Sequence, residues 1–191
     1  LYTDDYTRYT WLYPMRRKSE VLSHFQTFLA FIKTHFSGSL KNLQSDGGTK
    51  YVNISTSTLC KFLGIHHHIS CLHTPEQNGL AERKHRHISE MARTLLLSGH
   101  VPLNLWVEAV STAVYLINRL PTPILQWDSP FSHLFGRSPC YSDLRVFGCA
   151  CYPHLGAYVT NKLLPRSIEC VFLGYSSQHK GYRCLDPDRS E

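Results

Sequence analysis

The sequence predicts an α/β fold followed by a small all-β module. Apolar residues recur at helical spacing in several stretches up to residue 120, and short β-like runs lie between them. Strands that alternate with helices are typical of α/β layers. Proline becomes frequent after Arg119, and only short β-like runs follow from residue 145. We therefore expect domains at residues 1–120 and 145–191, joined by a connecting segment at 121–144.

Strands and helices alternate through the first 100 residues. Residues 1–13 are rich in aromatic and β-branched side chains and contain polar turn formers, which predicts two short antiparallel strands. A helix follows, with Ser19 as its N-cap and Gly38 just past its end. Its apolar face consists of Val21, Phe25, Phe28, Leu29, Ile32 and Phe36. Further strands are expected at 40–43 and 66–70, and further helices at 57–63 and 79–97.

Another predicted helix begins near Pro102 and carries a strong apolar stripe. The stripe is formed by Trp106, Ala109, Val110, Ala113, Val114 and Ile117. We expect it to be core, with a dimer face as the alternative. The C-terminal module has β-like runs at 145–152, 168–175 and 182–185. Its basic residues, with tyrosines between them, suit either nucleic-acid contact or scattered surface charge: Lys162, Arg166, Lys180 and Arg183.

Composition describes a globular, basic chain. Of 191 residues, 42% are hydrophobic, and the formal net charge is +6 with histidines neutral, which suits a polyanionic partner. The seven cysteines are odd in number and show no C-x-x-C spacing, so neither a disulfide framework nor a zinc finger is expected. Free thiols fit a reducing compartment, nuclear or cytoplasmic. No apolar run approaches the length of a membrane span.

Two carboxylates stand out by their settings. Asp46 ends a short apolar run before two glycines, and Glu82 lies in the first turn of a predicted helix, with thirty-five residues between them. Such a pair can be a glycosidase acid and base, a calcium site or a two-metal site. Glu82 is followed by cations, which favours a phosphodiester substrate over a sugar: Arg83, Lys84 and Arg86. The alternative is a solvated helix face with Glu82–Arg86 and Arg86–Glu90 ion pairs.

The runs around these carboxylates, LQSDGGTKYVN and HTPEQNGLAERKHRHISEMARTLL, carry a family resemblance. They resemble the strand, loop and helix that form the active site of integrases of copia-type LTR retrotransposons. The run LYTDDYTRYTWLYPMRRKSEV resembles the second and third strands of that family. LWVEAVSTAVYLINRLPT and PRSIECVFLGYSSQHKGYRCLD resemble its later helix and its SH3-like module. The resemblance covers nearly the whole chain.

This resemblance implies an RNase H-like core with a D,D-35-E metal triad, followed by an SH3-like module. Asp46 matches the second aspartate and Glu82 matches the glutamate, so both are expected to hold Mg²⁺ or Mn²⁺. Gln77 and Asn78 match a loop that touches DNA ends. The helix positions that lie near DNA in the family are matched by Arg83, Lys84 and Arg86. No cofactor other than a divalent metal is implied.

The chain also departs from the family pattern. The first aspartate of the family lies in a D-x-x-G-P strand, central in the sheet, whose position falls before Leu1. Asp4 and Asp5 match the next strand and turn instead, and Lys50 stands where the family commonly has an acid. The zinc module that opens the family's integrases is absent from the sequence. We therefore expect a fragment of a Pol polyprotein that is inactive by itself.

Three histidines in the run His66–His68, with His73, invite a metal interpretation. On a strand, His66 and His68 share a face while His67 points away, and no cysteine or acid stands at ligand spacing, so zinc is disfavoured. Cys149 and Cys151 are expected to be core positions on one strand face.

The resemblance implies DNA integration as the function. The full enzyme would trim the 3′ ends of element DNA and join them to host DNA, as a homo-oligomer. Two alternatives stay open: a non-catalytic nucleic-acid-binding or assembly remnant of a retroelement, and an RNase H-like nuclease acting on RNA–DNA hybrids. DNA binding without metal-dependent cleavage would select the first alternative, and hybrid cleavage the second.

Overall fold

A computed structural model describes residues 1–48, 51–71, 78–155, 163, 165–176 and 179–187. The chain forms two compact units, one of residues 13–84 and the other of residues 1–12 with 85–191. The domain boundaries predicted from the sequence stay predictions. Among the described residues, no helix is long and apolar enough to cross a membrane.

The unit of residues 13–84 contains a parallel strand pair. After the single turn of η1 (Lys18–Glu20) come α1 (Val21–Phe36), β3 (Asn42–Ser45), α2 (Ile54–Leu63) and β4 (His66–Ile69). β3 and β4 pair in parallel with Asn42 opposite His66, and α2 supplies the crossover that a parallel pair needs. The start of α3 (Gly79–Ser98) also belongs to this unit.

Helix ends in this unit differ in part from the sequence prediction. Ser19 is not the N-cap of α1, because it lies inside η1, where the Arg17 N–H donates to Glu20 Oε1 at 3.1 Å. Ser37, in the left-handed region at φ 49°, caps the C-terminus of α1 in place of Gly38. The α2 helix begins three residues earlier than predicted, because Asn53 Oδ1 accepts from the Thr56 N–H at 2.8 Å.

The other unit combines a strand pair, helices and a three-stranded sheet. β1 (Tyr2–Thr3) and β2 (Thr10–Trp11) are antiparallel, as predicted. α4 (Trp106–Ile117) follows α3 through η3 (Leu103–Leu105). The connecting segment contains η4 (Pro123–Leu125) and α5 (Pro130–Phe135). β5 (Ala150–Cys151), β6 (Cys170–Tyr175) and β7 (Tyr182–Leu185) form an antiparallel sheet in the order β5-β6-β7.

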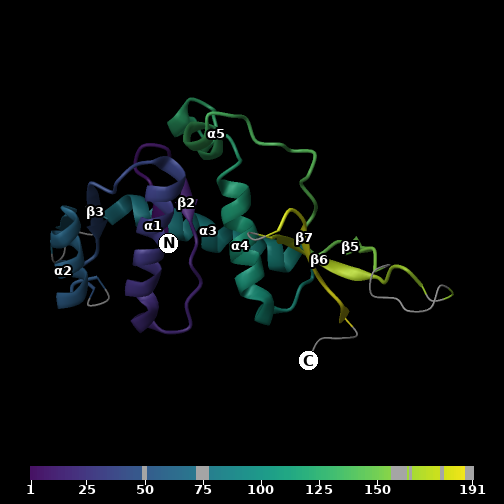
Figure 1. Cartoon of the computed structure of the whole chain (residues 1–191). Coiled ribbons are helices and arrows are strands. Elements are labelled where there is room, and N and C mark those ends of the chain that lie inside the picture. The colour runs from purple at the N-terminus through teal and green to yellow at the C-terminus, as the bar shows by residue number, and fades with distance from the viewer. Residues whose placement is uncertain (49–50, 72–77, 156–162, 164, 177–178, 188–191) are drawn as a thin grey trace. The chain divides into compact units, whose positions relative to one another are not determined.

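The core of this unit joins helices to the C-terminal sheet. It is formed by Ile88, Ala92, Leu96, Val101, Ala109, Ala113, Val114, Ile117, Phe147 and Leu173. The predicted apolar stripe of α4 is therefore core, although Trp106 at its start is 56% exposed. α4 lies against β6 (Figure 1), where Thr112 Oγ1 donates to the Leu173 carbonyl at 3.2 Å. Gly174, at φ +127°, leaves the space that Thr112 occupies, since a Cβ there would collide with Oγ1.

Asn118, at the end of α4, ties three elements together. Its amide accepts from the Thr10 N–H at 2.9 Å and donates to the Thr10 carbonyl at 2.8 Å, as a neighbouring strand would. Its own carbonyl accepts from the Phe131 N–H of α5 at 2.7 Å. Asn118 and Thr10 are almost completely buried, so these hydrogen bonds are shielded from water.

Candidate metal and nucleic-acid site

Asp46 lies immediately after β3, at the carboxyl end of a parallel strand. Its side chain is partly buried, with Oδ1 inaccessible to solvent, and it leans over Gly48. A Cβ built on Gly48 would lie 3.1 Å from Asp46 Oδ1, whereas one built on Gly47 would meet nothing within 4 Å. Gly48 is therefore the glycine that makes room for the carboxylate.

The backbone on both sides of Asp46 is held by hydrogen bonds that sequence reasoning missed. Ser45 Oγ donates to the Asp46 carbonyl at 3.0 Å and lies 2.8 Å from His67 Nε2 on β4. The Ser45 carbonyl accepts from the Ser70 N–H at 3.0 Å and from Ser70 Oγ at 3.3 Å. The parallel register, which places Leu43 opposite His67, turns His67 to this side of the sheet. The sequence does not indicate this register, so it could not identify His67 as a partner of Ser45.

His67 differs from its neighbours in environment, as the alternation predicted. His66 and His68 are exposed and stack on the other face, with ring centroids 6.4 Å apart. Burial lowers the pKa of the His67 imidazole, and the neighbouring His68 lowers it further. His67 is thus a neutral hydrogen-bonding group at neutral pH. His73 lies outside the described residues.

Glu82 occupies the first turn of α3 and is exposed. It lies in the same compact unit as Asp46. Within the described part of the chain, no group of three or more histidine, cysteine or acidic side chains is arranged to hold a metal. Two carboxylates still offer the hard oxygen donors that Mg²⁺ prefers, and Mg²⁺ usually keeps several waters in its shell. The donor chemistry at Asp46 and Glu82 therefore fits this ion.

The predicted nucleic-acid contacts lie around the start of α3. Asn78 directly precedes the helix and is partly buried, while Gln77 falls outside the described residues. The Arg83 guanidinium leans back toward Gly79, since a Cβ built there would lie 3.1 Å from it. Arg83 and Arg86 are exposed, and Lys84 is partly buried. The Glu82–Arg86 and Arg86–Glu90 ion pairs weighed as an alternative do not occur in the described structure.

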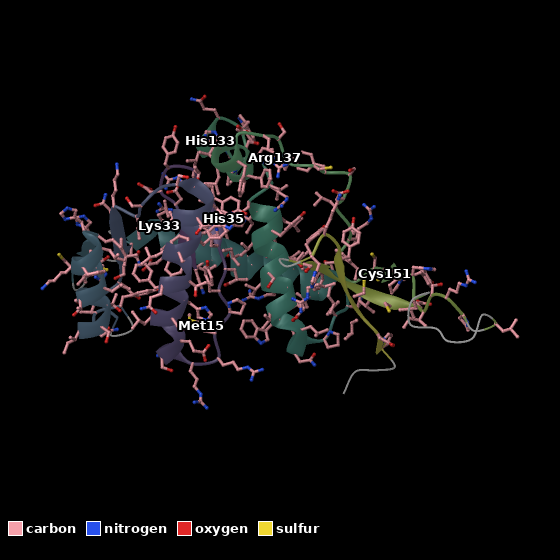
Figure 2. The ribbon with its side chains drawn as sticks, viewed as in Figure 1. Met15, Lys33, His35, His133, Arg137 and Cys151 are labelled. Carbon is pink, nitrogen blue, oxygen red and sulfur yellow. The ribbon has the colours of Figure 1, made fainter. Side chains whose placement is uncertain are left out.

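Several cysteines lie close together in the C-terminal sheet. Figure 2 labels Cys151 on β5. In the sheet this residue pairs with Cys170 of β6. Burial raises the pKa of the Cys151 thiol to about 12, with further contributions from Cys184 and its other thiol neighbours.

Arg183 forms an ion pair with Glu108 at 2.7 Å, so its charge is partly neutralised within the protein. Lys162 lies outside the described residues.

A substitution at Gly48 tests whether the space above it serves Asp46. Gly48→Ala is expected to displace the Asp46 carboxylate by a few tenths of an ångström. We expect this to weaken Mn²⁺ binding about twofold to fivefold, because a misplaced ligand binds the ion less well. Gly47→Ala is the matched control, since its Cβ meets nothing. The measurement is the Mn²⁺ concentration that half-broadens the Asp46 amide signal in NMR spectra. Equal effects of the two alanines would contradict this role of Gly48.

Comparison with known proteins places these residues in context. Residues 149–191 match the family model of the retroviral polymerase SH3-like domain. The chain is 50% identical over 185 residues to the retrovirus-related Pol polyprotein from transposon RE2 of Arabidopsis thaliana, covering 97% of this chain and 13% of that protein. It is 38% identical over 186 residues to the Pol polyprotein from transposon TNT 1-94 of Nicotiana tabacum, covering 97% and 14%. The chain thus spans about an eighth of the length of these curated relatives.

A solved structure shows the same fold at low sequence identity. The chain resembles the HTLV-2 integrase catalytic core domain, determined in complex with magnesium in a trimeric form, with a TM-score of 0.51 and 18% identity. The match covers 68% of this chain and 79% of that one. Together with the SH3-like match, this similarity confirms the fold class predicted from the sequence.

Proposed function

We propose that the chain is the integrase region of a copia-type retrotransposon Pol polyprotein and that it contributes to metal-dependent joining of element DNA to host DNA. Its similarity to two plant Pol polyproteins and to the SH3-like family model supports this proposal. Asp46 and Glu82 would hold Mg²⁺, or Mn²⁺ in its place. The observation that carries the proposal is the placing of Asp46. Asp46 follows a parallel strand whose end is fixed by hydrogen bonds. The missing side chain of Gly48 leaves room for its carboxylate. Oligomer formation and an intracellular, reducing location belong to the same proposal.

The residues of the chain would divide the chemistry between them. When bound, divalent ions activate the attacking hydroxyl and stabilise the leaving oxygen in phosphoryl transfer. Asp46 and Glu82 supply negative oxygen ligands from a strand end and a helix start. Arg83, Lys84 and Arg86 follow Glu82 on one helix, where they can bind phosphates on either side of the reacting one. Asn78, at the helix start, can contact the end of the DNA.

The family resemblance assigns a further aspartate to a strand before the position of Leu1. The experiment therefore adds such a segment to the chain. A chimera that carries the upstream segment of the Arabidopsis RE2 relative ahead of Leu1 is expected to join a 3′-hydroxyl oligonucleotide to a target duplex with Mg²⁺ or Mn²⁺. The 191-residue chain alone is expected to be inactive in the same assay. Clear activity of the chain alone, abolished by Glu82→Gln, would overturn that second expectation. An inactive but folded chimera would count against the proposal itself.

A second candidate function is DNA binding or assembly without catalysis. It is favoured by the basic character of the chain, with a formal net charge of +6, and by the exposed Arg83 and Arg86 on α3. Salt-dependent binding of duplex DNA by the chimera, with no metal-dependent cleavage or joining, would select this candidate.

The cations of α3 give a prediction that both candidates share. Arg86→Gln is expected to weaken duplex binding uniformly across sequences and to reduce the slope of log affinity against log salt by about 1, the value for one phosphate contact. Lys33→Gln is the matched control, because Lys33 is exposed on α1 (Figure 2), and it should lower the slope less. Fluorescence anisotropy over a salt series measures both. If both variants change the slope equally, the binding is diffuse attraction to a basic protein.

A further inference from the structure

Hydrogen bonds hold both of the peptide groups that flank Asp46 in place. The group before it, through the Ser45 carbonyl, accepts two hydrogen bonds from Ser70. The group after it, through the Asp46 carbonyl, accepts the hydrogen bond of Ser45 Oγ. A planar peptide leaves two soft backbone angles per residue, so two fixed planes determine the direction of the bond from Cα to Cβ. The position from which the Asp46 carboxylate starts is thereby set.

The hydrogen bond from Ser45 Oγ to the Asp46 carbonyl depends on His67. A serine hydroxyl has one hydrogen to donate. When Ser45 donates it to the Asp46 carbonyl, at 3.0 Å, the 2.8 Å contact between Ser45 Oγ and His67 Nε2 has the imidazole N–H as its donor. This bond then holds the hydroxyl in the rotamer that reaches the Asp46 carbonyl. Ser45 is only 5% exposed, so water competes little for either bond.

We propose that His67 is a positioning residue that acts through Ser45 Oγ to fix the direction in which Asp46 presents its carboxylate. The ligand that the carboxylate then holds rests on the proposed function, but the positioning itself does not. His67 lies on β4 and Asp46 follows β3, so the parallel pairing of these strands brings the two residues into one chain of hydrogen bonds.

The variants separate the hydrogen bond from the bulk of the ring. His67→Leu removes the donor, and Ser45→Ala removes the relay. His67→Gln keeps an N–H donor at similar reach, and Ser45→Thr keeps the hydroxyl. His66→Leu is the matched control, because His66 lies on the same strand and faces the opposite side. Circular dichroism on each variant establishes that the chain is folded before the other measurements are made.

Two readouts on the 191-residue chain test the proposal, the first without metal. Three-bond couplings between the amide and α protons of the metal-free protein report the backbone angle φ of Asp46, and nitrogen-15 spectra report whether His67 carries its proton on Nε2. We expect one dominant backbone conformation at Asp46 in the native chain and in His67→Gln, Ser45→Thr and His66→Leu. His67→Leu and Ser45→Ala should give averaged couplings. The Mn²⁺ concentration that half-broadens the Asp46 signal should rise about fivefold in those two variants, the factor for one lost hydrogen bond.

The outcomes distinguish this proposal from the proposed function. An unchanged Asp46 backbone coupling in His67→Leu and Ser45→Ala overturns the positioning role, whatever the metal does. An averaged coupling in His67→Gln to the same extent as in His67→Leu also overturns it, because ring packing would then be the cause. If the coupling behaves as expected but Mn²⁺ broadens nothing near Asp46 in the native chain, the positioning role stands and metal binding fails.

Discussion

Replacing Asn118 by alanine is expected to cost about 3 kcal/mol of folding free energy, because two buried backbone groups lose their hydrogen bonds at once, each worth roughly 1–3 kcal/mol when left unsatisfied. The Thr10 N–H and carbonyl are both bonded by the Asn118 amide, at 2.9 and 2.8 Å. Thr10 is 1% exposed, so water cannot replace the lost partner without disturbing the packing of β2 against the end of α4.

Urea unfolding followed by far-ultraviolet circular dichroism measures this cost. Asn104→Ala is the matched control, since Asn104 is exposed in η3 and the same chemical change is made there outside the core. The control is expected to lie within about 0.5 kcal/mol of the native chain, as surface substitutions usually do. A loss of less than about 1 kcal/mol in Asn118→Ala would show that the hydrogen bonds of the Asn118 amide to Thr10 contribute little to the stability of the fold.

The second large effect is expected at Glu82. In the chimera with the upstream RE2 segment, Glu82→Gln should lower the rate of strand transfer by roughly a thousandfold. Charge stabilisation by a bound metal is worth several kcal/mol of barrier, and each 1.36 kcal/mol is a factor of ten in rate. Glutamine keeps the length of the side chain and removes the negative charge, so α3 should fold unchanged.

Glu90→Gln provides the comparison for this loss. Glu90 is exposed on the same helix, eight residues further on, and the change in net charge is the same. It should leave the transfer rate within about twofold, as expected for a surface charge far from the reacting groups. Equal losses in the two variants would mean that the helix charge, and not a metal ligand at Glu82, supports the reaction.

Local patterns in the sequence predicted much of the fold because the physical signals were local. The apolar spacing of α1 and α4, the glycine after α2 and the alternation of His66–His68 all act within a few residues, and each element lies where expected within a few positions. The missed caps have local causes as well. The helix at α2 was predicted to begin at residue 57, so Asn53 was not considered as its N-cap. Ser37 was overlooked after α1 because the glycine beside it, Gly38, matches the usual preference for a helix end.

Contacts between distant residues could not be predicted in this way. Nothing near Asn118 in the sequence indicates that its amide bonds Thr10, which is 108 positions away. The same holds for Thr112, which bonds the Leu173 carbonyl of the C-terminal sheet and so joins that sheet to α4. At the candidate site, the sequence pointed to Asp46 and Glu82 but not to Ser45 and His67, because their contact depends on the register of two parallel strands.

If Asp46 and Glu82 hold the same divalent ion, a Mn²⁺ titration of the nitrogen-15-labelled 191-residue chain should detect both carboxylates together. Paramagnetic broadening should reach the Asp46 and Glu82 signals at the same Mn²⁺ concentration. Glu82→Gln should raise, several-fold, the concentration needed to broaden Asp46, and Asp46→Asn should do the same to Glu82, while Glu90→Gln changes neither. Independent broadening of the two signals, each unaffected by loss of the other carboxylate, would contradict a shared site.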